Sequence, residues 1–101
     1  IQRMMIIRIV KLTINENHKN DFIDLFNNNK SLISSFEGCE KVQLLKDDTN
    51  SKIFFTYSHW KNIESLENYR HSDTFKSIWK KTKTYFCDKP EAWSLKNLSH
   101  E

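Results

Sequence analysis

The chain has 101 residues and a mass of 12.2 kDa, which is enough for one compact domain and too little for two. Apolar residues make up 38% of the sequence, with one glycine and one proline, so collagen-like repeats and long disordered linkers are excluded. Sixteen Lys and Arg against thirteen Asp and Glu give a net charge of +3. Because this small excess is spread along the chain, it does not indicate a nucleic-acid-binding face. No apolar run is long enough to span a membrane.

The cysteines and the N-terminal residues indicate the cytoplasm. The first residues lack the apolar core and small-residue cleavage site of a signal peptide. Cys39 and Cys87 lie far apart without CxxC spacing, so two reduced thiols are expected. The His, Cys and acidic residues show no metal-binding spacing, and a single glycine rules out a glycine-rich phosphate loop. We therefore expect neither a metal nor a cofactor.

The first half of the chain predicts a strand, a helix and a hairpin. Residues 5–14 are dense in Ile, Val and Leu, which favours a central strand. Apolar residues at helical spacing follow from Phe22 to Phe36, and Gly38 stands where a left-handed helix cap is needed. Residues 42–45, a polar turn at 47–50 and residues 53–60 then predict a strand, a turn and a strand.

The second half predicts a helical region and a last strand. Helical spacing begins at Asn62, restarts at Ser72 and stops before Pro90. Residues 92–98 alternate well enough to form a strand. The order β-α-β-β-α-β is the ferredoxin-like arrangement. We therefore predict an α+β fold with a four-stranded antiparallel sheet, in a single domain that covers residues 5–98.

The strands indicate a second copy of the chain. Two helical regions cover one face of a four-stranded sheet, yet the first strand has Ile7 and Ile9 on the other face, and the third has Phe55 and Tyr57 there. A face exposed to water should alternate to polar residues. Leaving large apolar side chains exposed forfeits roughly 1.5–3 kcal/mol each, and contiguous apolar patches mark interfaces. We therefore predict a homodimer through the open sheet face.

Residues 54–79, FFTYSHWKNIESLENYRHSDTFKSIW, resemble the antibiotic biosynthesis monooxygenase family. In that family an aromatic-rich third strand ends in Tyr-x-x-aromatic, and a short helix with a Leu and a Ser-x-x-Phe follow. The matching residues here are Tyr57, Trp60, Leu66, Ser72 and Phe75. The turn at residues 36–39, Phe-Glu-Gly-Cys, is similar as well, and the resemblance extends over residues 6–98.

The resemblance implies a dimeric α+β barrel with a pocket between the sheet and helices of each subunit. It also implies cofactor-independent oxygenation of a small aromatic or quinol-like compound. Quinol-oxygenase-like relatives often have a Glu and a His where this chain has Ser58 and Tyr69. The Asn, Trp and haem-ligating His of haem-degrading relatives fall on Val10, Tyr69 and Trp79, so haem degradation is not expected.

The candidate catalytic base is His71, near the junction of the two helical segments, because imidazole titrates in the useful range. Its other interpretation is a solvated surface histidine. His59 shares the face of Tyr57 and is expected to point toward the dimer rather than the pocket.

The expected substrate pocket residues are three aromatic side chains and one charge. Trp60, Tyr69 and Trp79 suit a planar ligand by stacking, although an ordinary core uses the same residues. Arg8 stands among Ile and Val, where a charge is rarely left unpaired. It either pairs with a carboxylate across the dimer or directs an anionic group of the substrate into the pocket.

Two functions remain open at this stage. The first is an enzyme of the kind described above. The alternative is a non-catalytic dimeric module of the same fold that binds a small apolar or aromatic ligand. RNA binding is not expected, because residues 52–57 lack the glycines of RNA-recognition modules and the open face is predicted to be buried.

Overall fold

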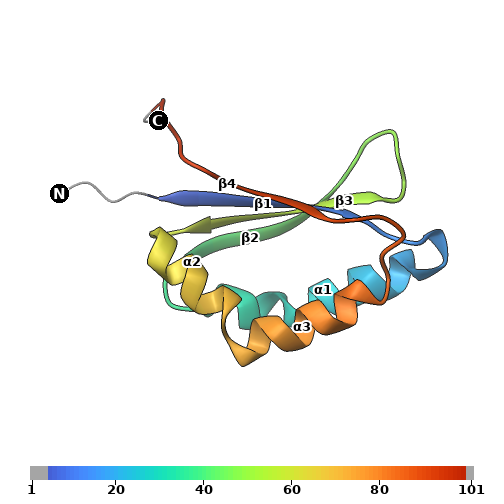
Figure 1. Ribbon diagram of the computed structural model, residues 1–101, viewed down its shortest axis with the longest axis horizontal. Helices are drawn as coiled ribbons and strands as arrows, with labels where there is room; N and C mark the ends of the chain where they lie inside the picture. The colour runs from blue at the N-terminus through green and yellow to red at the C-terminus, as the bar shows by residue number, and fades with distance from the viewer. Residues whose placement is uncertain (1–4, 100–101) are drawn as a thin grey trace.

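A computed structural model describes residues 5–99 of the chain. One antiparallel sheet carries all three α-helices on the same side (Figure 1). The elements in chain order are β1 Ile6–Thr13, the 3-10 helix η1 Glu16–His18, α1 Lys19–Ser34, β2 Cys39–Lys46, β3 Ile53–Trp60, α2 Ile63–Arg70, α3 Asp73–Lys83 and β4 Glu91–Leu95. The predicted α+β, ferredoxin-like fold class is confirmed.

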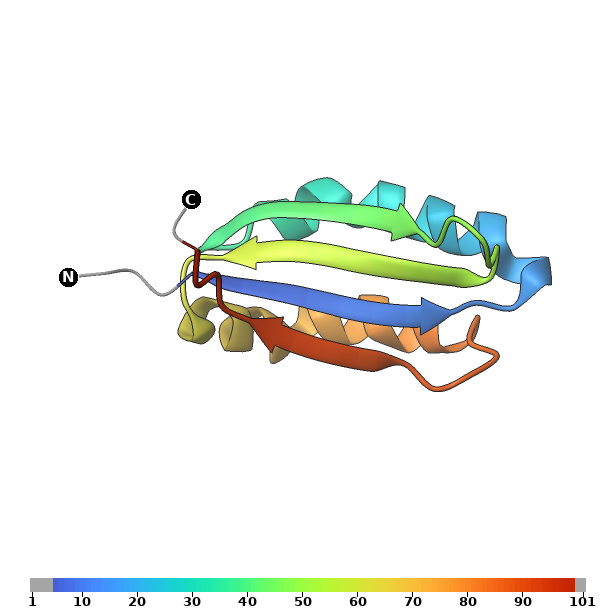
Figure 2. The same ribbon diagram turned by 90° about the horizontal axis from the view of Figure 1, so that it is seen from above.

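The strands lie in the order β2-β3-β1-β4, which Figure 2 shows from the side opposite the helices. β2 and β4 differ in extent from the sequence prediction. β2 extends from Cys39 to Lys46 because it pairs with β3 over nearly its whole length, and β4 pairs with β1 from Glu91 to Leu95 and ends there. The extent of both strands depends on a partner strand rather than on local composition.

The starts of α2 and α3 agree with the sequence prediction, whereas α1 begins after His18 without a side-chain cap. The Asn62 side chain accepts a hydrogen bond from the backbone N–H of Ser65 at 2.8 Å and caps α2. Ser72 Oγ accepts one from the N–H of Phe75 at 3.1 Å and caps α3, so the second helical region is two helices. Gly38 adopts a φ of +84°, the left-handed conformation expected of it.

The core lies between the helices and the face of the sheet formed by the even-numbered residues of β1 and β3. Trp60 and Leu66 anchor one cluster of buried side chains, and Leu12 and Phe54 anchor the other. Trp60 Nε1 donates a hydrogen bond to Ser58 Oγ at 2.9 Å, so the buried indole has a partner.

The other face of the sheet has no helix over it within the described chain; we call it the open face (Figure 2). Strand register assigns to it the apolar residues Ile7, Ile9, Leu45, Ile53, Phe55, Tyr57, Trp93 and Leu95. Trp93 and Leu95 remain 42% and 43% exposed. Over residues 5–99, no helix has the length and apolar character that crossing a bilayer demands.

Candidate functional site

A cavity of about 330 Å³ lies between the sheet and the helices. It exists because the sheet residues beneath the helices are short at its centre. Val10 pairs with Thr56 on β3 and with Ala92 on β4, and all three line the cavity. Since folded interiors are close-packed, a row of short side chains beneath helices held by larger neighbours leaves a hollow. The volume is at the lower end of ligand pockets, which suits a compound of one or two rings.

Aromatic rings form much of the cavity wall. Trp60 stacks on Tyr69 with ring centroids 5.1 Å apart and an interplanar angle of 23°. Phe75 stacks on Trp79 at 5.8 Å and 14°. All four side chains line the cavity, from β3, α2 and α3. The surface that they present suits a flat, apolar ring system.

Tyr69 contributes the phenol of this wall. Burial raises the pKa of its hydroxyl well above the usual value, with a smaller contribution from Cys39, so the side chain is neutral at physiological pH. Within residues 5–99 the hydroxyl makes no hydrogen bond. It is therefore available as a donor to a ligand.

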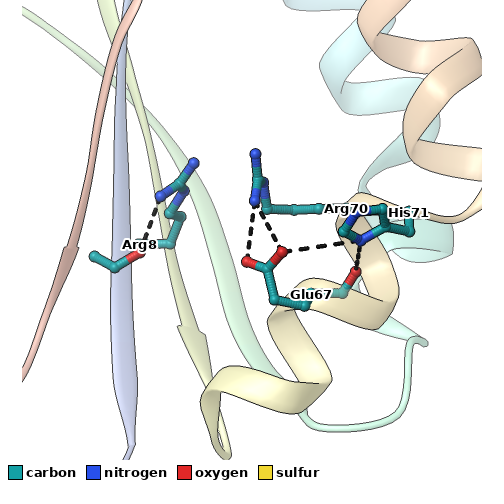
Figure 3. A network of polar contacts seen from close by, with 5 residues as sticks. Arg8, Glu67, Arg70 and His71 are labelled. Atoms are coloured by element: carbon teal, nitrogen blue, oxygen red, sulfur yellow. Dashed lines mark hydrogen bonds and ion pairs between the residues drawn. The ribbon is translucent and has the colours of Figure 1, made fainter.

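Arg8 brings a charge to the sheet side of the cavity (Figure 3). Its guanidinium is half-buried, and its Nη1 donates a hydrogen bond to Ser94 Oγ at 2.9 Å. No carboxylate of the described residues is within ion-pair distance of it. Arg8 lies on the face of the sheet that the helices cover, whereas the predicted dimer uses the open face.

A second arginine lines the same end of the cavity. Arg70 Nη1 donates to both carboxylate oxygens of Glu67 at 3.0 Å, one turn earlier on α2. The pKa of Arg8 is lowered, first by burial and then by the charge of Arg70, whereas Glu67 acts in the opposite direction. Glu67 is thus committed to Arg70 and only partly offsets the charge of Arg8.

His71 lies at the C-terminal cap of α2, outside the cavity lining. Its side chain is 74% exposed, and Nδ1 donates to the backbone carbonyl of Glu67 at 2.8 Å (Figure 3). The structure therefore separates His71 from Trp60, Tyr69, Trp79 and Arg8, all four of which line the cavity. A catalytic role for His71 stays a prediction, as does substrate binding by the other four.

His59 lies on the open face, as its position in the strand predicts. Its Nε2 is 2.9 Å from the hydroxyl of Tyr57, and its register partner on β1 is Ile7. Burial lowers the pKa of the imidazole, and Lys41 lowers it further. The ring therefore favours the neutral form and has no access to the cavity from this face.

Three strand residues that shape the site could not be singled out from the sequence: Thr56 and Ala92 line the cavity, and Ser94, outside the lining, binds Arg8. Ser94, Thr56 and Ala92 are ordinary strand residues, and their importance comes from register: Arg8 pairs with Ser94, and Val10 pairs with the other two. The described part of the chain contains no cluster of His, Cys, Asp or Glu that could hold a metal ion.

Comparisons with known proteins give a family and a fold. The sequence profile of the family described as "Antibiotic biosynthesis monooxygenase" matches residues 5–81. Among curated proteins, none matches the chain significantly.

Several solved structures superimpose closely. A proposed antibiotic biosynthesis monooxygenase from Nitrosomonas europaea gives a TM-score of 0.89 at 12% identity, over 99% of this chain and 96% of that one. A similarly described protein from Caulobacter crescentus CB15 gives 0.88 at 16% identity, over 96% and 92%. A conserved protein from Methanosarcina mazei Go1 gives 0.87 at 20% identity, over 92% of each chain. At such identities these likenesses establish the fold alone.

Proposed function

The chain belongs to the antibiotic biosynthesis monooxygenase family, and on this premise we propose that it oxygenates a small aromatic or quinol-like compound without a cofactor. The observation that carries the proposal is the cavity of about 330 Å³, walled by stacked aromatic side chains. A space of this size and lining takes one or two fused rings.

The reaction needs little from the protein because the substrate supplies the electrons. A quinol that meets O₂ loses its hydroxyl protons and one ring C–H, and becomes a hydroxyquinone. One oxygen atom is bonded to the ring carbon and the other leaves as water, so the quinol provides all four electrons. The protein has to hold the ring, stabilise its anion and keep the site dry.

Trp79 and Tyr69 are proposed to pack against the substrate ring, with Trp60 behind Tyr69, and Arg8 is proposed to face its oxygen atoms. His71 is the base that the sequence proposes. Its ring lies outside the cavity. The variant His71→Ala therefore tests whether the substrate can lose its proton to solvent when this imidazole is absent.

Oxygen uptake with a panel of small hydroquinones and anthrones tests the proposal. We expect the wild-type protein to consume oxygen with at least one of them, and Val10→Phe to abolish this by filling the hollow. Ile63→Phe makes a comparable change at an exposed position of α2 outside the cavity and should leave uptake unchanged. No uptake with any compound, together with saturable quenching of tryptophan fluorescence, would instead establish the non-catalytic binding module.

The open face is proposed as the interface of a homodimer, which completes a dimeric α+β barrel. Members of this family are typically dimeric, and the open face carries a contiguous set of apolar side chains without a covering layer in the described chain. The two cysteines are free thiols, which supports the cytoplasm as the proposed compartment.

A further inference from the structure

One end of the cavity is polar, in contrast to the rest of its wall. Ser58, Arg8 and Ser94 stand in one row across β3, β1 and β4 on the face that the helices cover. Ser58 Oγ already accepts from Trp60 Nε1, and Ser94 Oγ accepts from Arg8 Nη1. A guanidinium has five N–H donors. Within residues 5–99 only this one of them has a protein acceptor.

The charges at this end do not balance. Glu67 binds Arg70 through both oxygens and so compensates that guanidinium. Arg8 has no such partner among the described residues, and Arg70 next to it makes its charge less favourable. Among the described residues, Glu91 is the one acidic residue in the cavity lining, and it pairs in register with Lys11, so its side chain belongs to the opposite face of the sheet. One positive charge therefore remains uncompensated.

A half-buried, uncompensated charge beside a like charge is costly, and a bound anion removes that cost. The planar fork of a guanidinium matches two oxygen atoms in one plane, as in a carboxylate. Since one positive charge is uncompensated, the charge balance favours a monoanion over a dianion such as phosphate.

We infer that the cavity takes an aromatic monoanion whose planar pair of oxygen atoms, from a carboxylate or a delocalised enolate, binds Arg8 while the ring packs against Trp79. The inference rests on the proposed function of the cavity and narrows its substrates from aromatic compounds in general to acidic ones.

Binding of matched probe pairs tests the inference. For the carboxylate, 2-naphthoate is compared with neutral 2-naphthamide. For the enolate, 2-hydroxy-1,4-naphthoquinone, an anion at pH 7, is compared with its neutral 2-methoxy ether. Affinities are measured by tryptophan fluorescence and calorimetry under argon. We expect the wild-type protein to bind the anion of at least one pair tenfold or more tightly than its neutral partner, and the pair that shows this identifies the source of the oxygens.

In Arg8→Gln the affinities for the anion and for its neutral partner should differ by no more than about twofold. Lys80→Gln removes the same charge from an exposed position on α3 outside the cavity and should leave the ratio unchanged. Equal binding of anion and neutral compound in both pairs, or a preference that Arg8→Gln retains, would overturn the inference. If Arg8→Gln does not fold, the wild-type ratios of anion to neutral-compound affinity decide, together with the variant Arg8→Lys. Arg8→Lys keeps the charge but loses the planar fork, so its preference for the anion should be smaller.

Because the binding measurements need no oxygen, they can refute the inference without refuting the proposed function, and oxygen uptake can do the reverse. Anion binding through Arg8 without oxygen uptake would uphold the inference and refute the monooxygenase. Uptake with neutral quinols that Arg8→Gln leaves unchanged would uphold the monooxygenase and refute the inference.

Discussion

Trp93 offers the sharpest test of the proposed dimer. It lies on the open face, paired in register with Ile9, and 42% of it is exposed in the protomer. A tryptophan buries about 150–250 Å² when fully enclosed, so covering the exposed part at ~25 cal/mol/Å² contributes about 2 kcal/mol. In a twofold dimer the residue counts twice, which gives about 4 kcal/mol, or roughly a thousandfold in the dissociation constant.

Sedimentation equilibrium from nanomolar to high micromolar concentration measures this effect. We expect the wild-type protein to be dimeric at micromolar concentration and Trp93→Ala to be largely monomeric there, with an unchanged circular dichroism spectrum. A wild-type protein that stays monomeric over the whole range would refute the inference from the two-faced sheet. So would a Trp93→Ala variant that associates as tightly as the wild type.

Two leucines provide a matched control. Leu95 on the open face is 43% exposed and Leu32 on α1 is 49% exposed, so alanine removes a similar apolar area at each position. Leu95→Ala should weaken the dimer about tenfold or more, because the loss again counts twice. Leu32→Ala should leave it unchanged. The reverse result would place the interface on the helices.

Three predictions concern the fold itself. Gly38→Ala should lower the free energy of unfolding in urea by ~2 kcal/mol or more, because φ is +84° and the new methyl group would meet the Ser65 side chain; adding Ser65→Gly should restore part of this. Ser72→Ala should cost about 1 kcal/mol in the same assay, since the cap of α3 loses its acceptor. Burial raises the pKa of Tyr69 above that of the unfolded chain, so the stability that this group contributes is complete below about pH 10 and is lost as the pH rises further. A pH series of urea melts should therefore decline less steeply above pH 10 for Tyr69→Phe than for the wild type.

The parts of the fold that local chemistry determines could be predicted from the sequence. Asn62 and Ser72 cap helices through hydrogen bonds to backbone groups three residues away. Gly38 adopts a positive φ angle, which glycine reaches without strain. The ends of β2 and β4 could not be predicted as well, because they depend on where β3 and β1 offer a partner.

The candidate site, too, could be predicted only where local sequence determines it. Arg8 could be singled out because it is a charge inside an apolar strand, and the structure places it at the cavity. Its partner Ser94 is 86 residues away and is found only through strand register. For His71 the sequence allowed a catalytic base or a solvated surface side chain, and the structure gives the exposed position, because the turn between α2 and α3 and the carbonyl group of Glu67 hold the ring toward solvent.

The hollow itself has a simple origin in β3. Its residues facing the helices are Phe54, Thr56, Ser58 and Trp60, which read large, small, small, large. Phe54 and Trp60 are each 1% exposed and hold the helices away from the sheet at both ends, so the two short side chains between them leave space that nothing else fills. Arg8 pairs with Ser58 and lines the cavity, whereas Lys46, which pairs with Phe54, does not line it. The pattern that creates the cavity thus also determines where its charge lies, and a larger residue at Ser58 or Thr56 would remove both the space and access to Arg8.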